Sequence, residues 1–343
     1  MYLLLLLVSV LSARGDTTIR YAGCHKIASR KICQLASKEE ASQQMKNIST
    51  SVAKAVEWLR KQHIQNLWFD VPTSSWILQS LHLAGFAHEN KHCMKTIQSA
   101  MTQIDAAPID DFISLSGGKL ALLMIGMRAS CKDVKNFKQR NLINILRKKM
   151  YAFPKGEFDN FYQYCLGVIA LYVNGQDIPS EFGEEILSNV LIGRKDQGTR
   201  KILNPNKMAE TEALSVIALS AIGKQKFMSH WVRKHIYREQ EKAVKKINHI
   251  FRRHKPDSLM THAHMMQAMR TINGDKITQH PFCEKIYNWI ISQQNQDGSF
   301  GGVMETANVL LALSERSVLE LRHVSCPEKE FGTNRFGKEN LNY

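Results

Sequence analysis

The sequence predicts an all-α fold built from repeated helix pairs, and three observations predict it. Six apolar stretches each contain a small residue followed by Leu or Met, and these dipeptides recur every 44 to 50 residues. The stretches are apolar all round, as helices packed on every side must be. Charge-rich segments with apolar residues on one helical face lie between them. Repeats of this length are typical of stacked helix pairs, in which inner and outer helices alternate.

The dipeptides place the expected inner helices along the chain. They are Ser80-Leu81, Gly126-Met127, Ala170-Leu171, Ala218-Leu219, Ala268-Met269 and Ala312-Leu313. A polar, turn-forming stretch precedes each helix, at residues 70–74, 114–118, 157–160, 204–207, 255–258 and 296–302. Ser, Thr, Asp and Asn in such stretches accept hydrogen bonds from the free N–H groups of a helix start.

The expected outer helices include residues 141–150 and 237–251, whose apolar residues recur on one face. Six inner and six outer helices would form an open solenoid or a closed ring. Terminal repeats of an open array usually present a polar outer side as caps. The last inner stretch, residues 306–313, is as apolar as the middle ones, which favours closure into an α/α toroid.

Closure has a consequence for binding. In a toroid all six inner helices start on the same rim, where free N–H groups and partial positive charge favour a polar or anionic ligand. The sequence therefore predicts any binding site at this rim.

The first 15 residues predict a secretory signal peptide. An apolar run over residues 2–11 is followed by small residues at Ala13 and Gly15, which fit cleavage before Asp16. The alternative is a buried N-terminal helix, which the lack of a polar face disfavours. No later apolar run approaches the roughly 20 residues of a transmembrane helix. We therefore expect a secreted, extracellular protein without membrane insertion.

The composition is that of a folded globular protein. The 343 residues are 44% hydrophobic and 22% charged, with 19 Gly and 8 Pro, which excludes disorder and collagen. We expect one toroid domain at residues 16–327, followed by a polar tail at residues 328–343.

The chain is strongly basic. Its formal net charge is +15, and residues 224–255 hold 11 Lys and Arg against 2 Glu. This segment coincides with an expected outer helix. Two interpretations stay open, a solvated helix face or a site for an acidic glycan or an acidic partner protein. Nucleic acid is not expected as a partner, because the chain contains no recognised binding motif for it.

Seven cysteines lie far apart, without a C-x-x-C pair or a nearby His at zinc-site spacing. Disulfides are the default in a secreted chain, and the odd number leaves at least one thiol over. One N-glycosylation sequon begins at Asn47, which predicts a glycan there if the side chain lies on the surface.

Four further segments carry a family resemblance. They are LALLMIGMRASC (residues 120–131), FYQYCLGVIAL (161–171), MAETEALSVIAL (208–219) and the stretch from Cys283 through QDGSFGG (296–302) to Cys326. In order and spacing they resemble the cobalamin carriers transcobalamin, intrinsic factor and haptocorrin, over roughly residues 30–327. The resemblance is to the α domain of that family, and it implies an α6/α6 toroid with six inner and six outer helices.

The resemblance also implies a corrinoid ligand and residues that bind it. Tyr162 and Gln163 match the family's tyrosine–glutamine pair at the ligand mouth, and Glu210 stands where the family has Asp. Lys207 lies where transcobalamin supplies a histidine to cobalt, and a protonated lysine cannot coordinate a metal. Ser258, in the turn before the fifth inner helix, completes the candidate set. Cobalamin is thus expected as a ligand, with no cofactor and no metal site of the protein's own.

The same resemblance implies two disulfides. Cys131 would pair with Cys326, and Cys283 would pair with an N-terminal cysteine, either Cys24 or Cys33.

Two departures from the family lower the expected affinity. The family buries cobalamin between the α domain and a C-terminal β domain, whereas this chain ends at Tyr343, which leaves no room for one. Gly301 and Gly302 stand where family members present Gln, His or Asn. We therefore expect corrinoid binding that is weak or assisted by a partner.

Two alternative functions stay open. One is a toroid that binds another extracellular ligand or a protein partner. The other is a glycosidase-like enzyme, which needs a pair of carboxylates. The rim carries Asp111, Asp159, Glu210, Asp257 and Glu305. Helix capping explains most of these carboxylates equally well, and His262 and His264 are two apart where a helical metal site needs four. We expect a non-catalytic binding protein in which these two histidines pack or cap.

Overall fold

The computed structural model describes residues 38–64, 71–85, 101–102, 104–153, 158, 160–195, 205–225, 230–254, 258–273, 281–324 and 326. The chain divides into two compact units, Met1–Leu35 and Ala36–Tyr343, and every described residue lies in the second. The predicted signal peptide and polar tail lie outside the described residues. Regular structure in the described residues is helical apart from one isolated bridge between Phe137 and Arg140, which confirms the all-α class.

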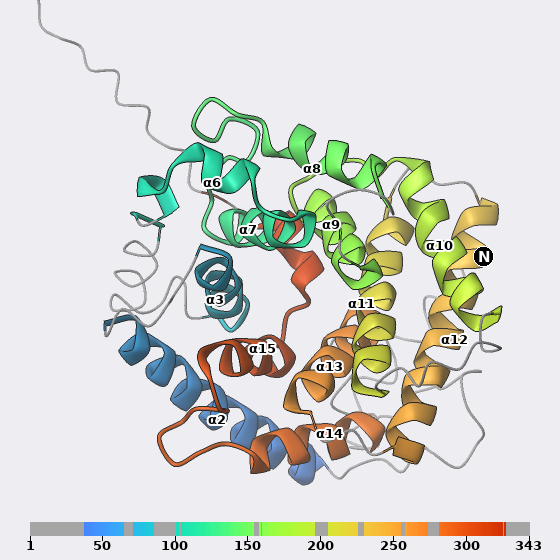
Figure 1. The fold of residues 1–343 in the computed structure, drawn as a ribbon. Helices are drawn as coiled ribbons and strands as arrows, with labels where there is room; N and C mark the ends of the chain where they lie inside the picture. Colours follow the sequence, from blue (N-terminus) through green and yellow to red (C-terminus); the bar gives the residue numbers. More distant parts are fainter. Residues whose placement is uncertain are drawn as a thin grey trace, which may run out of the picture. The chain divides into compact units, whose positions relative to one another are not determined.

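The inner helices form a closed circuit of contacts. In the described part of the chain they are α3 (Val71–Leu83), α7 (Gly117–Ala129), α9 (Phe161–Val173), α11 (Pro205–Gly223), α13 (Leu259–Asn273) and α15 (Val303–Leu313). Each helix contacts the next in this order, and α15 contacts α3 (Figure 1). Three of these helices, α3, α7 and α11, begin inside the predicted turn stretches. In α3 and α11 this fits Pro72 and Pro205, because proline is favoured in the first turn of a helix.

The repeated dipeptide marks the contacts between inner helices. Its small members are all buried, from Ser80 on α3 to Ala312 on α15. Gly126 of α7 shows why the position must be small, since a Cβ atom there would lie 2.4 Å from the carbonyl oxygen of Ser75 on α3. The small residue therefore recurs in the sequence because neighbouring inner helices approach each other closely at these positions.

Amphipathic helices pack against the outside of this circuit (Figure 1). They are α2 (Lys38–Ile64), α8 (Leu142–Tyr151), α10 (Ser180–Lys195), α12 (His230–His254) and α14 (Pro281–Ser292), with the short α6 (Ile109–Ile113) before α7. Both predicted outer helices occur. α8 begins after Asn141, whose side chain accepts a hydrogen bond from the Asn144 N–H at 3.1 Å. α12 is longer than predicted, because Ile236 extends its buried face toward the N-terminus. No described helix is both long and apolar enough to cross a membrane.

A 3₁₀ helix, η4 (Val318–His323), packs at the end of the circuit where the inner helices finish. It contacts α3, α7, α9 and α13. Arg128, in the last turn of α7, donates hydrogen bonds to the carbonyl oxygens of Leu321, Arg322 and Val324. Arg322 in turn donates to the Tyr172 carbonyl near the end of α9 at 2.8 Å. The helix starts, which form the predicted binding rim, lie at the opposite end.

Candidate ligand-binding site

Three side chains from alternate inner helices meet inside the circuit. The Tyr162 hydroxyl of α9 lies 2.9 Å from Nε2 of His264 on α13, and the two rings meet edge to face. The Trp76 ring of α3 meets His264 edge to face with centroids 6.4 Å apart. Since α3, α9 and α13 do not follow one another in the circuit, only side chains that point inward can meet in this way. The cluster therefore lies inside the circuit.

Burial controls the protonation of this cluster. Trp76 and His264 are 6% and 2% exposed. Burial lowers the pKa of the His264 imidazole, and the Glu210 carboxylate opposes that shift only in part. Burial also raises the pKa of the Tyr162 phenol above its usual range, and Glu210 and the Cys165 thiol raise it further. Tyr162 and His264 are therefore both neutral at pH 7.

Glu210 supplies the charge beside this neutral pair. It lies half-buried on α11, the helix between α9 and α13, and its Oε1 accepts a hydrogen bond from the Thr261 hydroxyl at 2.8 Å. The carboxylate thus keeps one fixed partner while it stays partly open to solvent. Such an oxygen can accept further hydrogen bonds from a ligand.

Helix caps hold these residues at the predicted rim. The Asn160 side chain accepts a hydrogen bond from the Gln163 N–H at 3.0 Å and caps α9, so Tyr162 and Gln163 lie in its first turn. The Ser258 hydroxyl accepts from the Thr261 N–H at 3.3 Å at the start of α13. Capping thus accounts for Ser258 locally, and it brings Thr261 to face Glu210.

The match to a known family covers most of the chain. The model of the eukaryotic cobalamin-binding protein family matches residues 23–338. The chain belongs to this family. No curated protein matches the chain. The resemblance carried by the four sequence segments is thereby confirmed.

In this member of the cobalamin-binding family, two other predicted ligand residues lie at the starts of inner helices. Gln163 is half-buried and packs over the start of α7, since a Cβ atom on Gly118 would lie 2.6 Å from Gln163 Cγ. Lys207 is exposed in the first turn of α11. Contact of these residues with a ligand stays a prediction, as it does for Tyr162, Glu210 and Ser258.

His264, Trp76 and Thr261 belong to the site but were not predicted from the sequence. The prediction that His262 packs is confirmed, because its ring stacks on Trp289 with centroids 3.8 Å apart. His264 packs too, yet it does so against Tyr162 inside the circuit. The two histidines differ because residues two apart on a helix point in different directions. Their two-residue spacing is the sequence feature that could have indicated that His262 and His264 lie on different faces of α13.

Three of the five rim carboxylates, Asp111, Glu210 and Glu305, lie in the described part of the chain. Glu210 is engaged by Thr261, and Asp111 is exposed on the short α6. Asp159 and Asp257 lie outside the described residues. Among the described residues, no three of His, Cys, Asp and Glu lie close enough together to hold a metal ion.

The turn at residues 296–302 has a structural role. Asp297 accepts hydrogen bonds from the Ser299 N–H at 2.9 Å and from Trp58 Nε1 of α2 at 3.1 Å. Gly298 has φ +96°, and a Cβ atom there would lie 2.6 Å from the Lys54 carbonyl oxygen. The turn therefore docks the start of α15 on α2 and needs glycine at this position.

The cysteines and the sequon were also predicted as sites. Cys131, just after α7, forms a disulfide with Cys326, as the resemblance implies. Cys283 is buried and unbonded in the structure, and its predicted partners, Cys24 and Cys33, lie outside the described residues. That pairing stays a prediction. Asn47 is exposed on α2, so its side chain lies on the surface, as a glycan at this position requires. The glycan itself stays a prediction.

A cavity of about 250 Å³ lies away from the predicted rim. It is bounded by α2 and by the residues that follow the last turns of α3 and α15, including Gly85 and Ser314. Its volume is below the roughly 300–1,000 Å³ of sites for drug-sized ligands. Gly85, which lines it, is the last described residue before residues 86–100, which lie outside the described residues. We therefore do not assign the ligand to this cavity.

Proposed function

We propose that this chain is a secreted, non-catalytic protein that binds a corrinoid at the rim where its inner helices start. Membership of the cobalamin-binding family and the closed circuit of inner helices support this proposal, and we take the circuit to be an α6/α6 toroid. The observation that carries the proposal is the cluster of Tyr162, His264 and Glu210. It joins aromatic surface, a neutral imidazole and a carboxylate at the end of the circuit opposite η4.

The proposed contacts follow from side-chain chemistry. Gln163 offers a donor and an acceptor to the amide side chains of the corrin ring, and Glu210 accepts hydrogen bonds from their N–H groups. Tyr162 offers an amphipathic ring. Lys207 is exposed, and a lysine ammonium offers no lone pair to cobalt, so we assign it no coordinating role. Cobalt therefore keeps its own upper ligand when the corrinoid binds.

The proposed affinity is micromolar or weaker for this chain alone, unless a partner completes the site. Gly301 and Gly302 are exposed just before α15, and neither offers a side-chain hydrogen-bonding group. A corrinoid there gains few polar contacts to offset the loss of its translational and rotational freedom.

Titration with cyanocobalamin tests the proposal. Corrin absorbance and tryptophan fluorescence should report micromolar binding with an almost unchanged cobalt spectrum. Gln163→Ala and Glu210→Gln should each weaken binding, the second by about tenfold or more, because hydrogen bonds to charged groups contribute about 1.5–3 kcal/mol. Glu184→Gln, at an exposed position of α10, is the matched control and should change nothing.

Three results would contradict parts of this proposal. No binding at millimolar corrinoid would leave a toroid that serves another extracellular ligand or partner. Nanomolar affinity would contradict weak binding, and a changed cobalt spectrum would contradict the role given to Lys207. Secretion has its own test, since protein recovered from culture medium should begin at Asp16.

A further inference from the structure

One face of α12 carries a row of exposed cations, which we call the basic ridge. Its members recur at spacings of three, four and seven residues, so they share one face of the helix. They are Lys234, Arg238, Lys242, Lys245 and Arg252. At 1.5 Å per residue the row is about 27 Å long.

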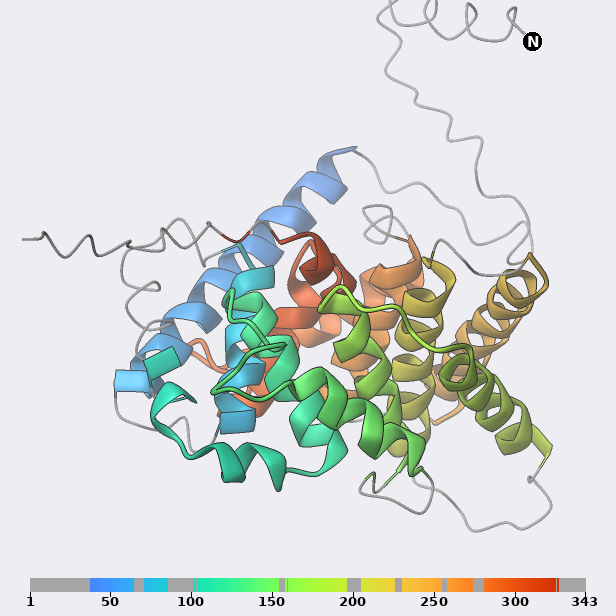
Figure 2. The ribbon, with the colours of Figure 1, turned by 90° about the horizontal axis from the view of Figure 1, so that it is seen from above.

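Packing fixes the direction in which the ridge faces. The opposite face of α12 buries Ile236, Ala243, Ile247 and Ile250, each at most 5% exposed. This face packs against α11, and α10 also contacts α12. Figures 1 and 2 both place α12 at the edge of the described unit. The helix cannot rotate without exposing this apolar face, so the ridge stays turned outward.

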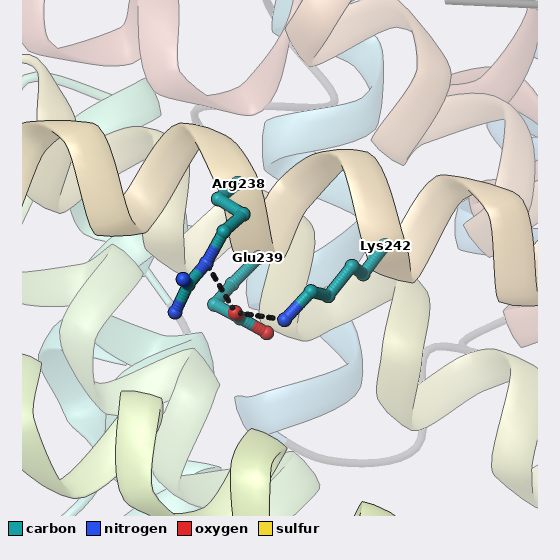
Figure 3. A network of polar contacts seen from close by, with 3 residues as sticks. All are labelled: Arg238, Glu239 and Lys242. Atoms are coloured by element: carbon teal, nitrogen blue, oxygen red, sulfur yellow. Dashed lines mark hydrogen bonds and ion pairs between the residues drawn. The ribbon is translucent and has the colours of Figure 1, made fainter.

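A buried carboxylate organises the middle of the ridge. Glu239 is 1% exposed, and its carboxylate lies between the side-chain ends of Arg238 and Lys242 (Figure 3). Its Oε1 is 3.3 Å from Arg238 Nε and 2.7 Å from Lys242 Nζ. A second pair joins Lys245 to Glu241 at 2.8 Å. These contacts hold three cationic groups in place, which reduces the side-chain entropy lost when an anion binds.

The ridge keeps a positive surplus after this pairing. Its five cations face two carboxylates, and Lys234 and Arg252 form no ion pair within the described part of the chain. The two unpaired cations lie toward opposite ends of α12, so the surplus extends along the whole row. Lys246 is not part of the ridge, because it pairs with Glu212 of α11.

We propose that the basic ridge binds a linear sulfated glycan. A straight row of cations matches an anion whose charges repeat along a chain. A protein partner would need an apolar or aromatic centre with few lysines. Tyr237, 64% exposed, is the only large apolar side chain exposed among the described positions of α12. The chemistry of the ridge therefore favours the glycan over an acidic protein.

Heparin-derived oligosaccharides are the probe, and three variants of the full chain carry the test. The ridge variant is Lys234→Gln, Lys245→Gln and Arg252→Gln. Arg238 and Lys242 stay, because both contact the buried Glu239 carboxylate, and replacing a partner of a buried charge is destabilising. A charge-preserving variant carries Lys234→Arg, Lys245→Arg and Arg252→Lys.

The matched control removes the same charge elsewhere. It carries Lys61→Gln, Lys135→Gln and Lys285→Gln, at exposed positions of α2, the loop after α7, and α14. Circular dichroism and corrinoid titration of all variants should be unchanged, which separates glycan binding from folding and from the proposed ligand site.

At 0.15 M salt the ridge variant should bind the oligosaccharide at least about tenfold more weakly, while the control and charge-preserving variants bind like the original chain. We also expect a weaker salt dependence in the ridge variant. In a plot of the logarithm of its oligosaccharide binding constant against the logarithm of salt concentration, the magnitude of the negative slope should decrease by about 1 for each lost contact, if sulfates release counterions as phosphates do. Four results would overturn the proposal: no binding by the original chain, an equal loss in the control, equal competition by polyglutamate, or equal binding of single-stranded DNA.

Discussion

At the scale of single residues, the contact between Tyr162 and His264 organises the interior of the rim. The two residues are 102 positions apart, and they meet because α9 and α13, which both pack against α11, direct these side chains into the circuit. His264 is 2% exposed, so its Nε2 depends on the Tyr162 hydroxyl for a hydrogen bond. The site therefore contributes to stability as well as to the proposed binding.

Removing the Tyr162 hydroxyl should cost stability. Tyr162→Phe leaves Nε2 of His264 buried without this partner, so the free energy of unfolding should fall by about 1–2 kcal/mol. Tyr151→Phe, at an exposed position, should leave it unchanged. Urea unfolding of both variants measures the difference. Equal stability of the original chain and Tyr162→Phe would mean that the contact contributes nothing.

His264 also predicts how stability depends on pH. Its pKa is lowered in the folded state below the value of about 6.5 that it has when unfolded. Below pH 6.5 the unfolded chain therefore binds more protons than the folded one, so stability should fall as the pH decreases. His264→Gln should remove up to about 1.4 kcal/mol per pH unit of this slope. Identical slopes between pH 5 and 7 in the two proteins would contradict a neutral, buried His264.

At the scale of helices, small residues decide how closely the inner helices approach. Gly126 has no room for a Cβ atom beside the backbone of Ser75, whereas Gly183 of α10 has ordinary space beside Ile222 at 3.5 Å. Both glycines lie inside helices, where alanine is intrinsically preferred. Their local propensities are therefore the same, and only packing distinguishes them.

The two glycines should respond with opposite sign. Gly126→Ala should destabilise the protein by about 1–3 kcal/mol, because two helices must separate. Gly183→Ala should stabilise it by about 0.5–1 kcal/mol through helix propensity alone. Thermal and urea unfolding measure both effects. A stabilising Gly126→Ala would show that α3 and α7 separate easily.

At the scale of the whole described unit, the segment that follows α15 is tied back to the inner helices. The Cys131–Cys326 disulfide and the three hydrogen bonds from Arg128 hold η4 against four inner helices. The disulfide spans 195 residues, and so it restricts the unfolded chain strongly.

Loss of this disulfide should lower stability substantially. In the chain-entropy model, replacing both Cys131 and Cys326 with Ser costs about 5 kcal/mol as an upper value. Peptide mapping under non-reducing conditions should first recover the two cysteines joined. Unfolding measurements on the double variant then give the loss, and a change below about 1 kcal/mol would contradict the entropic role.

The sequence by itself determined the features that depend on local pattern. The spacing of small-residue dipeptides predicted the inner helices, and the apolar face of residues 237–251 predicted α12. The family resemblance implied the Cys131–Cys326 bridge. The helix signals each lie in a short segment, where helical periodicity and residue type suffice, whereas the bridge was implied only by the resemblance.

Only the tertiary structure decided which distant side chains meet. It paired Tyr162 with His264, and it turned Lys246 toward Glu212 while its neighbour Lys245 stays on the ridge. Local periodicity sets the face of a helix on which a side chain lies, but the partner opposite that face depends on how the helices are arranged. That arrangement arises from packing over the whole unit, which no single segment specifies.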